Sequence, residues 1–380
     1  MIKRLYVNNF RCLVDFEISF DSMNLLLGPN GAGKSTVFDV LRRLQEFVTT
    51  GKEAYEVFRP SDLRRGKDGP LETIQTFELS VQDISDQAYT YRLDLEYSKD
   101  ENRMHLKTES LTRDGHRVFE YLSKDKRGVL YDIPGSGEKL LIPRNRSGLA
   151  FLAEATENVD VVWFKEFVLE HIYIVRVNPA LMKKEVQREE LHPKPDMSDF
   201  AAWYLSLMQA AGGDIYKSWE ALREVMPGFD AITFERSGDL KFLSLVFKET
   251  DGNGAKTLRL DELSDGQRVF LVLYTLLFCL PGNRVATLCM DEPENYLALP
   301  EIQPWLDKIY DKCEENQLQA ILISHHPKII NFLSRDCGLW LDRDSSNAPT
   351  LVKRLRAGVD SDLPISQLVE RGWIYDEYDK

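Results

Sequence analysis

The sequence lacks the features of membrane and secreted proteins. No apolar run approaches the roughly 20 residues that a membrane helix needs, and the longest, residues 269–280, also includes Tyr274 and Thr275. The first residues lead directly into a strand pattern and show no signal peptide. The five cysteines are scattered without a C-x-x-C pair, as expected of reduced thiols rather than a disulfide framework. These absences predict a cytoplasmic protein with no membrane partner.

The chain also lacks an excess of positive charge and any repetitive architecture. Its formal net charge is −13, which argues against a protein that coats nucleic acid without specificity, although a local basic groove is compatible with it. There is no internal repeat, low-complexity tract or sustained heptad pattern, so long coiled coils are excluded. The hydrophobic fraction of 43% over 380 residues is enough for a buried core in one large or two ordinary domains.

One glycine-rich stretch has the composition of a phosphate-binding loop. Residues 28–35 follow the pattern G-x-x-x-x-G-K-S, directly after an apolar strand pattern at 23–27 and before a helical pattern at 37–47. Glycines let backbone N–H groups close around phosphate oxygens, and the helix N-terminus adds positive potential. Lys34 can reach the β- and γ-phosphates, and Ser35 can ligate Mg²⁺. The alternative is an ordinary glycine turn, which the strand–loop–helix order disfavours.

Two later stretches supply groups that suit the same chemistry. Ser264 occupies the N-cap position of the apolar helix at 269–280, so a hydroxyl and free N–H groups point out of a second helix start; a merely capped helix is the alternative. A buried strand at 285–290 ends at Asp291 and Glu292. In a nucleotide site Asp291 would hold Mg²⁺, and Glu292 would orient or deprotonate the attacking water.

A histidine follows the next apolar strand. Residues 318–323 lead into Ser324-His325-His326-Pro327, and a histidine at a strand end beside the carboxylate strand could sense the γ-phosphate. We favour His325, because it directly follows Ser324 at the strand end. The alternative is a histidine with a structural role only.

The middle of the chain predicts two different substructures. Residues 72–133 alternate with period two and carry turn signals at short intervals, which predicts an antiparallel sheet that is broken at 134–137. Residues 198–226 predict a helical hairpin, with Ser198 as N-cap and Gly212-Gly213 at the turn. Strands are expected near 230–235, 240–248 and 256–260, and the polar segment 49–69 is expected to be a mobile loop.

Taken together, several stretches resemble the ABC-type ATPase heads of the SMC/RecF superfamily, most closely the compact bacterial ABC-like ATPases related to OLD-family and Septu-type defence ATPases. The stretches are 8–11, 28–35, 263–268, 290–293 and 324–325. The resemblance implies an α/β fold: an ABC-type P-loop ATPase head with a mixed sheet, an inserted antiparallel β subdomain and a small helical lobe. It divides the chain into a discontinuous head (1–50 and 229–380), a β-rich insertion (51–178) and a helical lobe (179–228).

The resemblance also implies how the site is assembled. Two heads would bind face to face around ATP, as a homodimer or higher homo-oligomer, with Ser264 and Gly266 of one head completing the site of the other. Glu292 and His325 would be catalytic, and Ser35 and Asp291 would ligate Mg²⁺. The residues implied in nucleotide binding are Asn30, Gly31, Gly33, Lys34, Ser35, Thr36, Ser264, Gly266 and Gln267.

Some features of the family are altered or hard to locate in this chain. Asp265 stands where transporter signatures commonly have glycine, and residues 295–299 occupy the inter-protomer loop of the family. The family carries a lobe-connecting glutamine, or an equivalent residue, that senses Mg²⁺. The candidates here are Gln75, Arg176 and Asn178, with Arg176 preferred.

The resemblance leads to one expected function and several alternatives. We expect an ATP-hydrolysing switch or scaffold for a separately encoded nuclease or toxin, in antiphage defence. Asp342-Arg343-Asp344 superficially matches the Asp-x-Asp of OLD nucleases, but we expect no nuclease site there. A RecF-like DNA clamp is the main alternative, and a transporter ATPase is a weaker one. The basic residues that favour a DNA partner are Arg64, Arg65, Lys183, Lys184 and Arg188.

Overall fold

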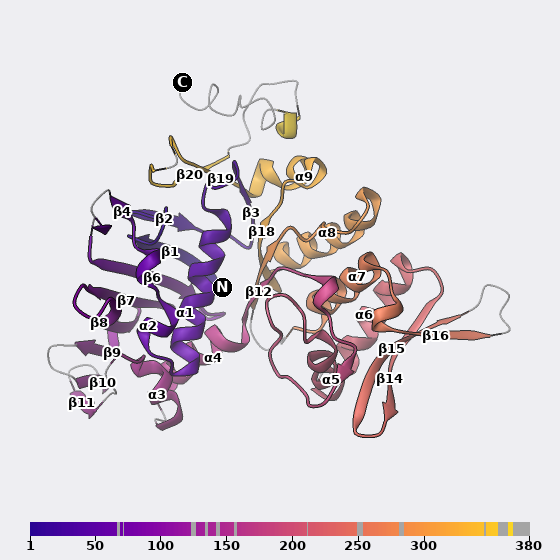
Figure 1. The fold of residues 1–380 in the computed structure, drawn as a ribbon, viewed down its shortest axis with the longest axis horizontal. Helices are drawn as coiled ribbons and strands as arrows, with labels where there is room; N and C mark the ends of the chain where they lie inside the picture. The colour runs from indigo at the N-terminus through magenta and orange to yellow at the C-terminus, as the bar shows by residue number, and fades with distance from the viewer. Residues whose placement is uncertain are drawn as a thin grey trace. The chain divides into compact units, whose positions relative to one another are not determined.

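The chain forms two compact units in the computed structural model (Figure 1). Unit 1 combines Met1–Ile172 with Gln319–Lys380, and unit 2 is Tyr173–Leu318. The structure describes residues 1–66, 69–70, 72–122, 127–133, 136–141, 145–155, 158–210, 212–248, 254–280, 285–345, 347–355 and 364–367.

Unit 1 contains a large antiparallel sheet, with strand order β11-β10-β9-β8-β7-β6-β1-β2. From β6 to β11 each strand pairs with the next along the chain, which confirms the antiparallel sheet predicted from residues 72–133. The sheet continues past the break predicted at 134–137, because β11 adds a further strand. The strands are β1 (Ile2–Asn8), β2 (Phe16–Ser19), β6 (Ile74–Gln82), β7 (Ala88–Ser98), β8 (Arg103–Arg113), β9 (His116–Leu122), β10 (Arg127–Ile133) and β11 (Ser136–Leu141).

A second sheet in unit 1 is built around β3 (Met23–Leu27), whose five residues are all buried. It pairs in parallel with β18 (Leu318–Ile323) on one side and β19 (Gly338–Asp342) on the other, while β20 (Leu351–Arg354) runs antiparallel to β19. Helix α9 (Pro327–Cys337) connects β18 to β19. The sequence predicted a strand at these positions, and the burial of all five residues is typical of a parallel sheet that is covered on both faces.

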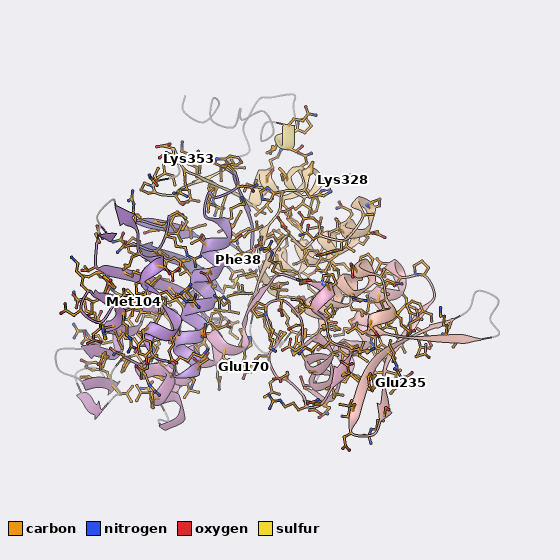
Figure 2. All side chains as sticks on the ribbon, viewed as in Figure 1. Phe38, Met104, Glu170, Glu235, Lys328 and Lys353 are labelled. Carbon is orange, nitrogen blue, oxygen red and sulfur yellow. The ribbon has the colours of Figure 1, made fainter. Side chains whose placement is uncertain are left out.

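Helix α1 (Lys34–Thr50) buries the apolar face that the sequence predicted, including Val37, Leu41 and Phe47. It contacts α2 (Ala54–Val57), α3 (Gly148–Ala155) and α4 (Val159–Glu170). Phe38 of α1 and Met104 of β8, both labelled in Figure 2, are buried.

The segment at 49–69 is more ordered than the mobile loop we expected. It contains α2, the 3-10 turn η1 (Pro60–Asp62) and the short strands β4 (Arg65–Gly66) and β5 (Gly69–Pro70). Buried Asp62 forms ion pairs with Arg11, whose Nε lies at 2.9 Å, and with Arg43, whose Nη1 lies at 2.9 Å. These contacts join the segment to the turn after β1 and to α1. No local periodicity in the sequence could have predicted them.

Unit 2 contains β17 (Ala286–Asp291) next to β12 (Ile172–Val175) in strand order. A separate sheet has the order β13-β15-β14, with β16 also paired to β15. Trp305 Nε1 of α8 donates to Leu273 O of α7 at 3.1 Å. The remaining elements are η2 (Pro179–Leu181), β13 (Glu185–Val186), α5 (Phe200–Ala210), α6 (Gly212–Val225), β14 (Phe229–Ser237), β15 (Leu240–Lys248), β16 (Ala255–Arg259), η3 (Leu260–Glu262), α7 (Asp265–Phe278) and α8 (Leu299–Glu314).

The helical hairpin expected at 198–226 is present as α5 and α6, with two corrections at its ends. Ser198 is not the N-cap, because α5 begins at Phe200 and the residue before it is Asp199, whose carbonyl oxygen accepts from Ala202 N at 2.9 Å and from Trp203 N at 3.1 Å. Gly212 and Gly213 are the first residues of α6 rather than its preceding turn. The strands expected after the hairpin are present as β14, β15 and β16.

Three further findings concern the whole described chain. Across the described residues, no helix has both the length and the apolar character needed to traverse a membrane. All five cysteines are free thiols. A short helical turn occupies residues 365–367.

Candidate functional site

The glycine-rich loop after β3 is shaped by very close backbone contacts. Gly28 has φ +139°, and a Cβ at this position would lie 2.0 Å from the carbonyl oxygen of Leu341 in β19. Gly33 has φ +105°, and its Cβ would lie 2.9 Å from Thr350 Oγ1 and 3.0 Å from Cys12 Sγ. Because L side chains rarely adopt such φ values and no space is left for them, this loop conformation requires glycine at both positions.

The loop delivers a helix N-terminus and an ammonium group to one place. Gly33 is the N-cap of α1, and no side chain caps this helix end. The Lys34 side chain is buried, and its Nζ donates to the carbonyl oxygens of Gly28 at 2.7 Å and Pro29 at 3.0 Å. Gly31 and Ser35 are exposed along the loop, as is Asn30, and Thr36 is half-buried. This arrangement suits an anion such as a phosphate.

Two residues from the C-terminal part of unit 1 donate hydrogen bonds to carbonyl oxygens of the glycine-rich loop. Arg343 Nη1 donates to Gly31 O at 3.1 Å, and Thr350 Oγ1 donates to Ala32 O at 2.9 Å. The sequence had suggested Arg343 only as part of a superficial nuclease motif. Nothing local in the sequence could have revealed these contacts, because Arg343 and Gly31 are 312 positions apart.

The two histidines after β18 have different environments. His326 is the N-cap of α9, where its Nδ1 accepts from Lys328 N at 3.2 Å. Burial, and secondarily the charge of Lys328, lowers the pKa of His326, which favours the neutral ring that this cap requires. His325 is exposed. Because β18 and β3 are parallel neighbours, His325 and the glycine-rich loop lie at the same edge of the sheet.

In unit 2 the predicted carboxylates end strand β17. Asp291 is the last residue of the strand, and its side chain is 10% exposed. Glu292 has φ 54°, a left-handed conformation that is costly for a residue other than glycine and often occurs at functional sites. Its carboxylate accepts from Asn295 Nδ2 at 2.7 Å, and its carbonyl oxygen accepts from Asn295 N at 3.1 Å. Asn295 therefore orients Glu292, a role that the sequence did not assign to it.

The start of α7 packs against the loop that follows Glu292. Ser264 is confirmed as the N-cap: its Oγ accepts from Gln267 N at 3.3 Å, and Gln267 Oε1 accepts from Ser264 N at 2.9 Å. A Cβ on Gly266 would lie 3.0 Å from Tyr296 O, so glycine permits this contact. Arg268 donates to Leu260 O at 2.9 Å and to two further carbonyl oxygens. Both predicted stretches of unit 2 thus form one contiguous group.

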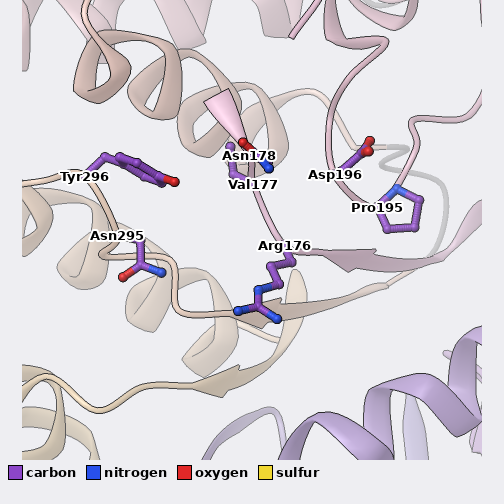
Figure 3. Close-up of a pocket in the computed structure, with 7 residues that line it drawn as sticks. All are labelled: Arg176, Val177, Asn178, Pro195, Asp196, Asn295 and Tyr296. Carbon is purple, nitrogen blue, oxygen red and sulfur yellow. The ribbon is translucent and has the colours of Figure 1, made fainter. Parts of the chain in front are cut away.

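A cavity of about 510 Å³ lies in unit 2, between the segment that follows β12 and the loop that follows Glu292 (Figure 3). Two of the three candidates for the Mg²⁺-sensing residue, Arg176 and Asn178, line it, and Arg176 Nη1 lies 3.9 Å from Asp291 Oδ2. The third candidate, Gln75, is fully buried in β6 of unit 1, where its Nε2 donates to Asn9 O at 3.0 Å. The cavity is lined by Arg176, Val177, Asn178, Pro195, Asp196, Asn295 and Tyr296.

The donor groups suit Mg²⁺ and a nucleoside triphosphate. Among the described residues, no group of three or more His, Cys, Asp or Glu side chains could hold a metal ion by itself. Mg²⁺ commonly takes one or two protein oxygens and completes its shell with phosphate oxygens and water, so the hard oxygens of Asp291 and Ser35 are suitable ligands. Ser35 and His325 belong to unit 1, whereas Asp291, Glu292 and residues 264–267 belong to unit 2. Their combination in one site stays a prediction.

Comparison with known proteins identifies the family. Residues 23–331 match the family described as "AAA domain, putative AbiEii toxin, Type IV TA system", which is most of the chain. The chain belongs to this AAA family. It is also 24% identical over 339 residues to an OLD nuclease from Thermus scotoductus. That alignment covers 86% of this chain but 59% of the relative, so the chain spans little more than half of that protein.

Solved structures with a similar fold are heads of SMC proteins. The SMC head bound to the C-terminal winged-helix domain of ScpA superposes with a TM-score of 0.57 at 12% identity, covering 93% of this chain and 98% of that one. The SMC head domain from Thermotoga maritima gives 0.47 at 13% identity, with the same coverage. Together with the AAA family, the first match confirms the predicted fold, an ABC-type P-loop ATPase head of the SMC/RecF type.

Proposed function

We propose that this protein binds and hydrolyses ATP. The observation that carries the proposal is the glycine-rich loop of residues 28–35, in which the buried Lys34 ammonium and the uncapped start of α1 are held together. Backbone N–H groups and one cation on a tight loop bind the phosphates of a nucleotide rather than a neutral ligand. Membership of an AAA family supports the same assignment.

The proposed mechanism gives each residue one task. Lys34 would bind the β- and γ-phosphates, while Ser35 and Asp291 would hold Mg²⁺, which neutralises phosphate charge when bound. Glu292, fixed by Asn295 at 2.7 Å, would orient and deprotonate the attacking water. His325, exposed at the end of β18, would contact the γ-phosphate.

We propose further that two copies assemble around ATP. The exposed positions of Ser264 and of the loop residues Asn30 and Gly31 support a role in contacting a second copy. In this arrangement Ser264 and Gly266, with Gln267, would complete the nucleotide site of the partner. ATP would then join two copies, and its hydrolysis would release them.

The biological role that we propose is a nucleotide-dependent switch for a separately encoded nuclease or toxin in antiphage defence. The similarity to an OLD nuclease and the toxin in the family description support this role. Free thiols at all five cysteines support the reducing cytoplasm as its location.

A measurement of ATP turnover and of mass in solution tests the proposal. The wild-type chain should hydrolyse ATP in a Mg²⁺-dependent manner and double its mass with ATP. Lys34→Ala should lose nucleotide affinity by about 10²-fold, because the main cation of the loop is gone, and it should stay monomeric. Arg42→Ala, on the solvated side of α1, is the control and should behave as wild type. A wild-type protein with no turnover and no ATP-dependent assembly would refute the proposal.

The alternative, a DNA clamp, receives less support from the described residues. Lys184 pairs with Asp261, and Arg188 lies 3.5 Å from Glu190, so acidic neighbours offset part of the expected basic surface. Salt-dependent DNA affinity, measured with and without ATP, distinguishes the two functions. Tight, strongly salt-dependent and ATP-dependent binding would favour the clamp.

A further inference from the structure

An arginine stands beside the carboxylate that we assign to Mg²⁺. Arg176 directly follows β12, the neighbour of β17 in strand order, and its Nη1 lies 3.9 Å from Asp291 Oδ2. The two side chains differ greatly in exposure, with 68% for Arg176 and 10% for Asp291. The carboxylate is therefore fixed in the protein, whereas the guanidinium can leave it.

The chemistry of a guanidinium decides what Arg176 can do here. It carries only hydrogen-bond donors and stays positively charged, so it cannot ligate a metal ion as a glutamine amide oxygen can. A second cation close to Asp291 would be repelled by it. Arg176 and Mg²⁺ therefore compete for one carboxylate.

The side chain of Arg176 can turn into the cavity while its backbone stays in place. The backbone beneath it is held, because Arg176 N donates to Pro195 O at 2.8 Å and Asn178 N donates to Asp196 O at 3.1 Å. The side chains of Asn178, Asp196 and Asn295 border the cavity (Figure 3), and their oxygens can accept from a guanidinium. Only the exposed side chain of Arg176 has to move.

We propose that Arg176 is a built-in competitor of Mg²⁺ at Asp291. It raises the metal concentration needed to load the site, and it turns into the cavity when Asp291 becomes a metal ligand. Metal loading then depends on nucleotide, because the phosphates supply the negative charge that offsets Arg176. The inference rests on the proposed ATP site. A residue that ligates the metal would lower the Mg²⁺ concentration needed to load the site, whereas Arg176 raises it.

Equilibrium binding of Mn²⁺ to the full chain tests this competition. Free Mn²⁺ is followed by its electron paramagnetic resonance signal in the presence of the non-hydrolysable analogue adenylyl imidodiphosphate, so turnover is not measured. Arg176→Gln should lower the half-saturating Mn²⁺ concentration by about two- to fivefold, the size expected when a partly exposed ion pair is removed. Arg176→Lys, which keeps the charge, should stay within about twofold of wild type.

Two further variants separate the possible failures. Lys217→Gln is the matched control, because it removes the same charge from a side chain of unit 2 that is 65% exposed, and it should leave Mn²⁺ binding unchanged. Asp291→Asn should abolish the binding. If Asp291→Asn binds Mn²⁺ as wild type does, the proposed site itself is wrong. If Asp291→Asn loses binding but Arg176→Gln binds no more tightly than wild type, only the competition is refuted.

Discussion

Single residues in unusual backbone conformations mark the candidate site. Glu292 adopts φ 54° directly after β17, and Gly28 lies so close to β19 that no side chain fits. Such conformations persist only where surrounding contacts maintain them, and Asn295 supplies two of these contacts to Glu292. Both residues lie in stretches that the sequence had singled out for chemistry.

The assignment of Glu292 as the base gives a prediction at this scale. Glu292→Gln should reduce ATP turnover by roughly 10²–10⁴-fold, because an amide cannot accept the proton of the attacking water. Nucleotide affinity should be preserved, since the amide oxygen can still accept from Asn295 Nδ2. Single-turnover hydrolysis and equilibrium nucleotide binding measure the two effects. Turnover at the wild-type rate would show that another residue is the base.

At the scale of elements, a buried carboxyl joins β8 to the start of α3. Glu109 is fully buried and accepts from Tyr91 Oη at 2.9 Å, Ser147 Oγ at 2.6 Å and Gly148 N at 2.7 Å. Burial raises the pKa of Glu109 to about 7, although these hydrogen bonds act in the opposite direction. An ordinary glutamate in the unfolded chain has a pKa of about 4.3.

The raised pKa of Glu109 predicts a pH dependence of stability. Between about pH 4.3 and 7 the folded protein holds a proton that the unfolded chain has released, so this contribution to stability, on the order of 3 kcal/mol, is lost as pH rises through that range. In Glu109→Gln the melting temperature should depend less on pH between about pH 5 and 7 than it does in the wild type. Glu96→Gln, at a carboxylate that is 53% exposed, should not show this change. An unchanged slope in Glu109→Gln would rule this contribution out.

The elements also show what the sequence could predict. The bounds of β3 and β18 agree with the sequence patterns, because each strand has a strong apolar pattern of its own. Helix α2 was missed, because four residues are too few to show a period. The hydrogen bonds from Arg343 and Thr350 to the glycine-rich loop could not be predicted either, since they join positions more than 300 residues apart.

At the scale of the whole molecule, a shared nucleotide site predicts complementation between two defective copies. Lys34→Ala and Ser264→Ala should each be nearly inactive as ATPases. A mixed dimer would contain one intact site, formed by Lys34 of one copy and Ser264 of the other, so an equimolar mixture should recover up to about half of wild-type activity. Steady-state ATP hydrolysis of the separate and mixed proteins measures this recovery. If the mixture stays as inactive as its components, the site is not shared.

The parallel pairing of β3 also determines when the protein can become functional during its synthesis. Met23 pairs with Ala320, and Gly28 lies against Leu341, so this strand and loop are completed by partners that are made much later in the chain. In contrast, β6 to β11 pair with their successors and can form while translation continues. At roughly 5–20 residues per second, the phosphate loop leaves the ribosome many seconds before β18 and β19. If the proposed ATP site is correct, we expect nascent chains to bind ATP only after β18 and β19 have been made.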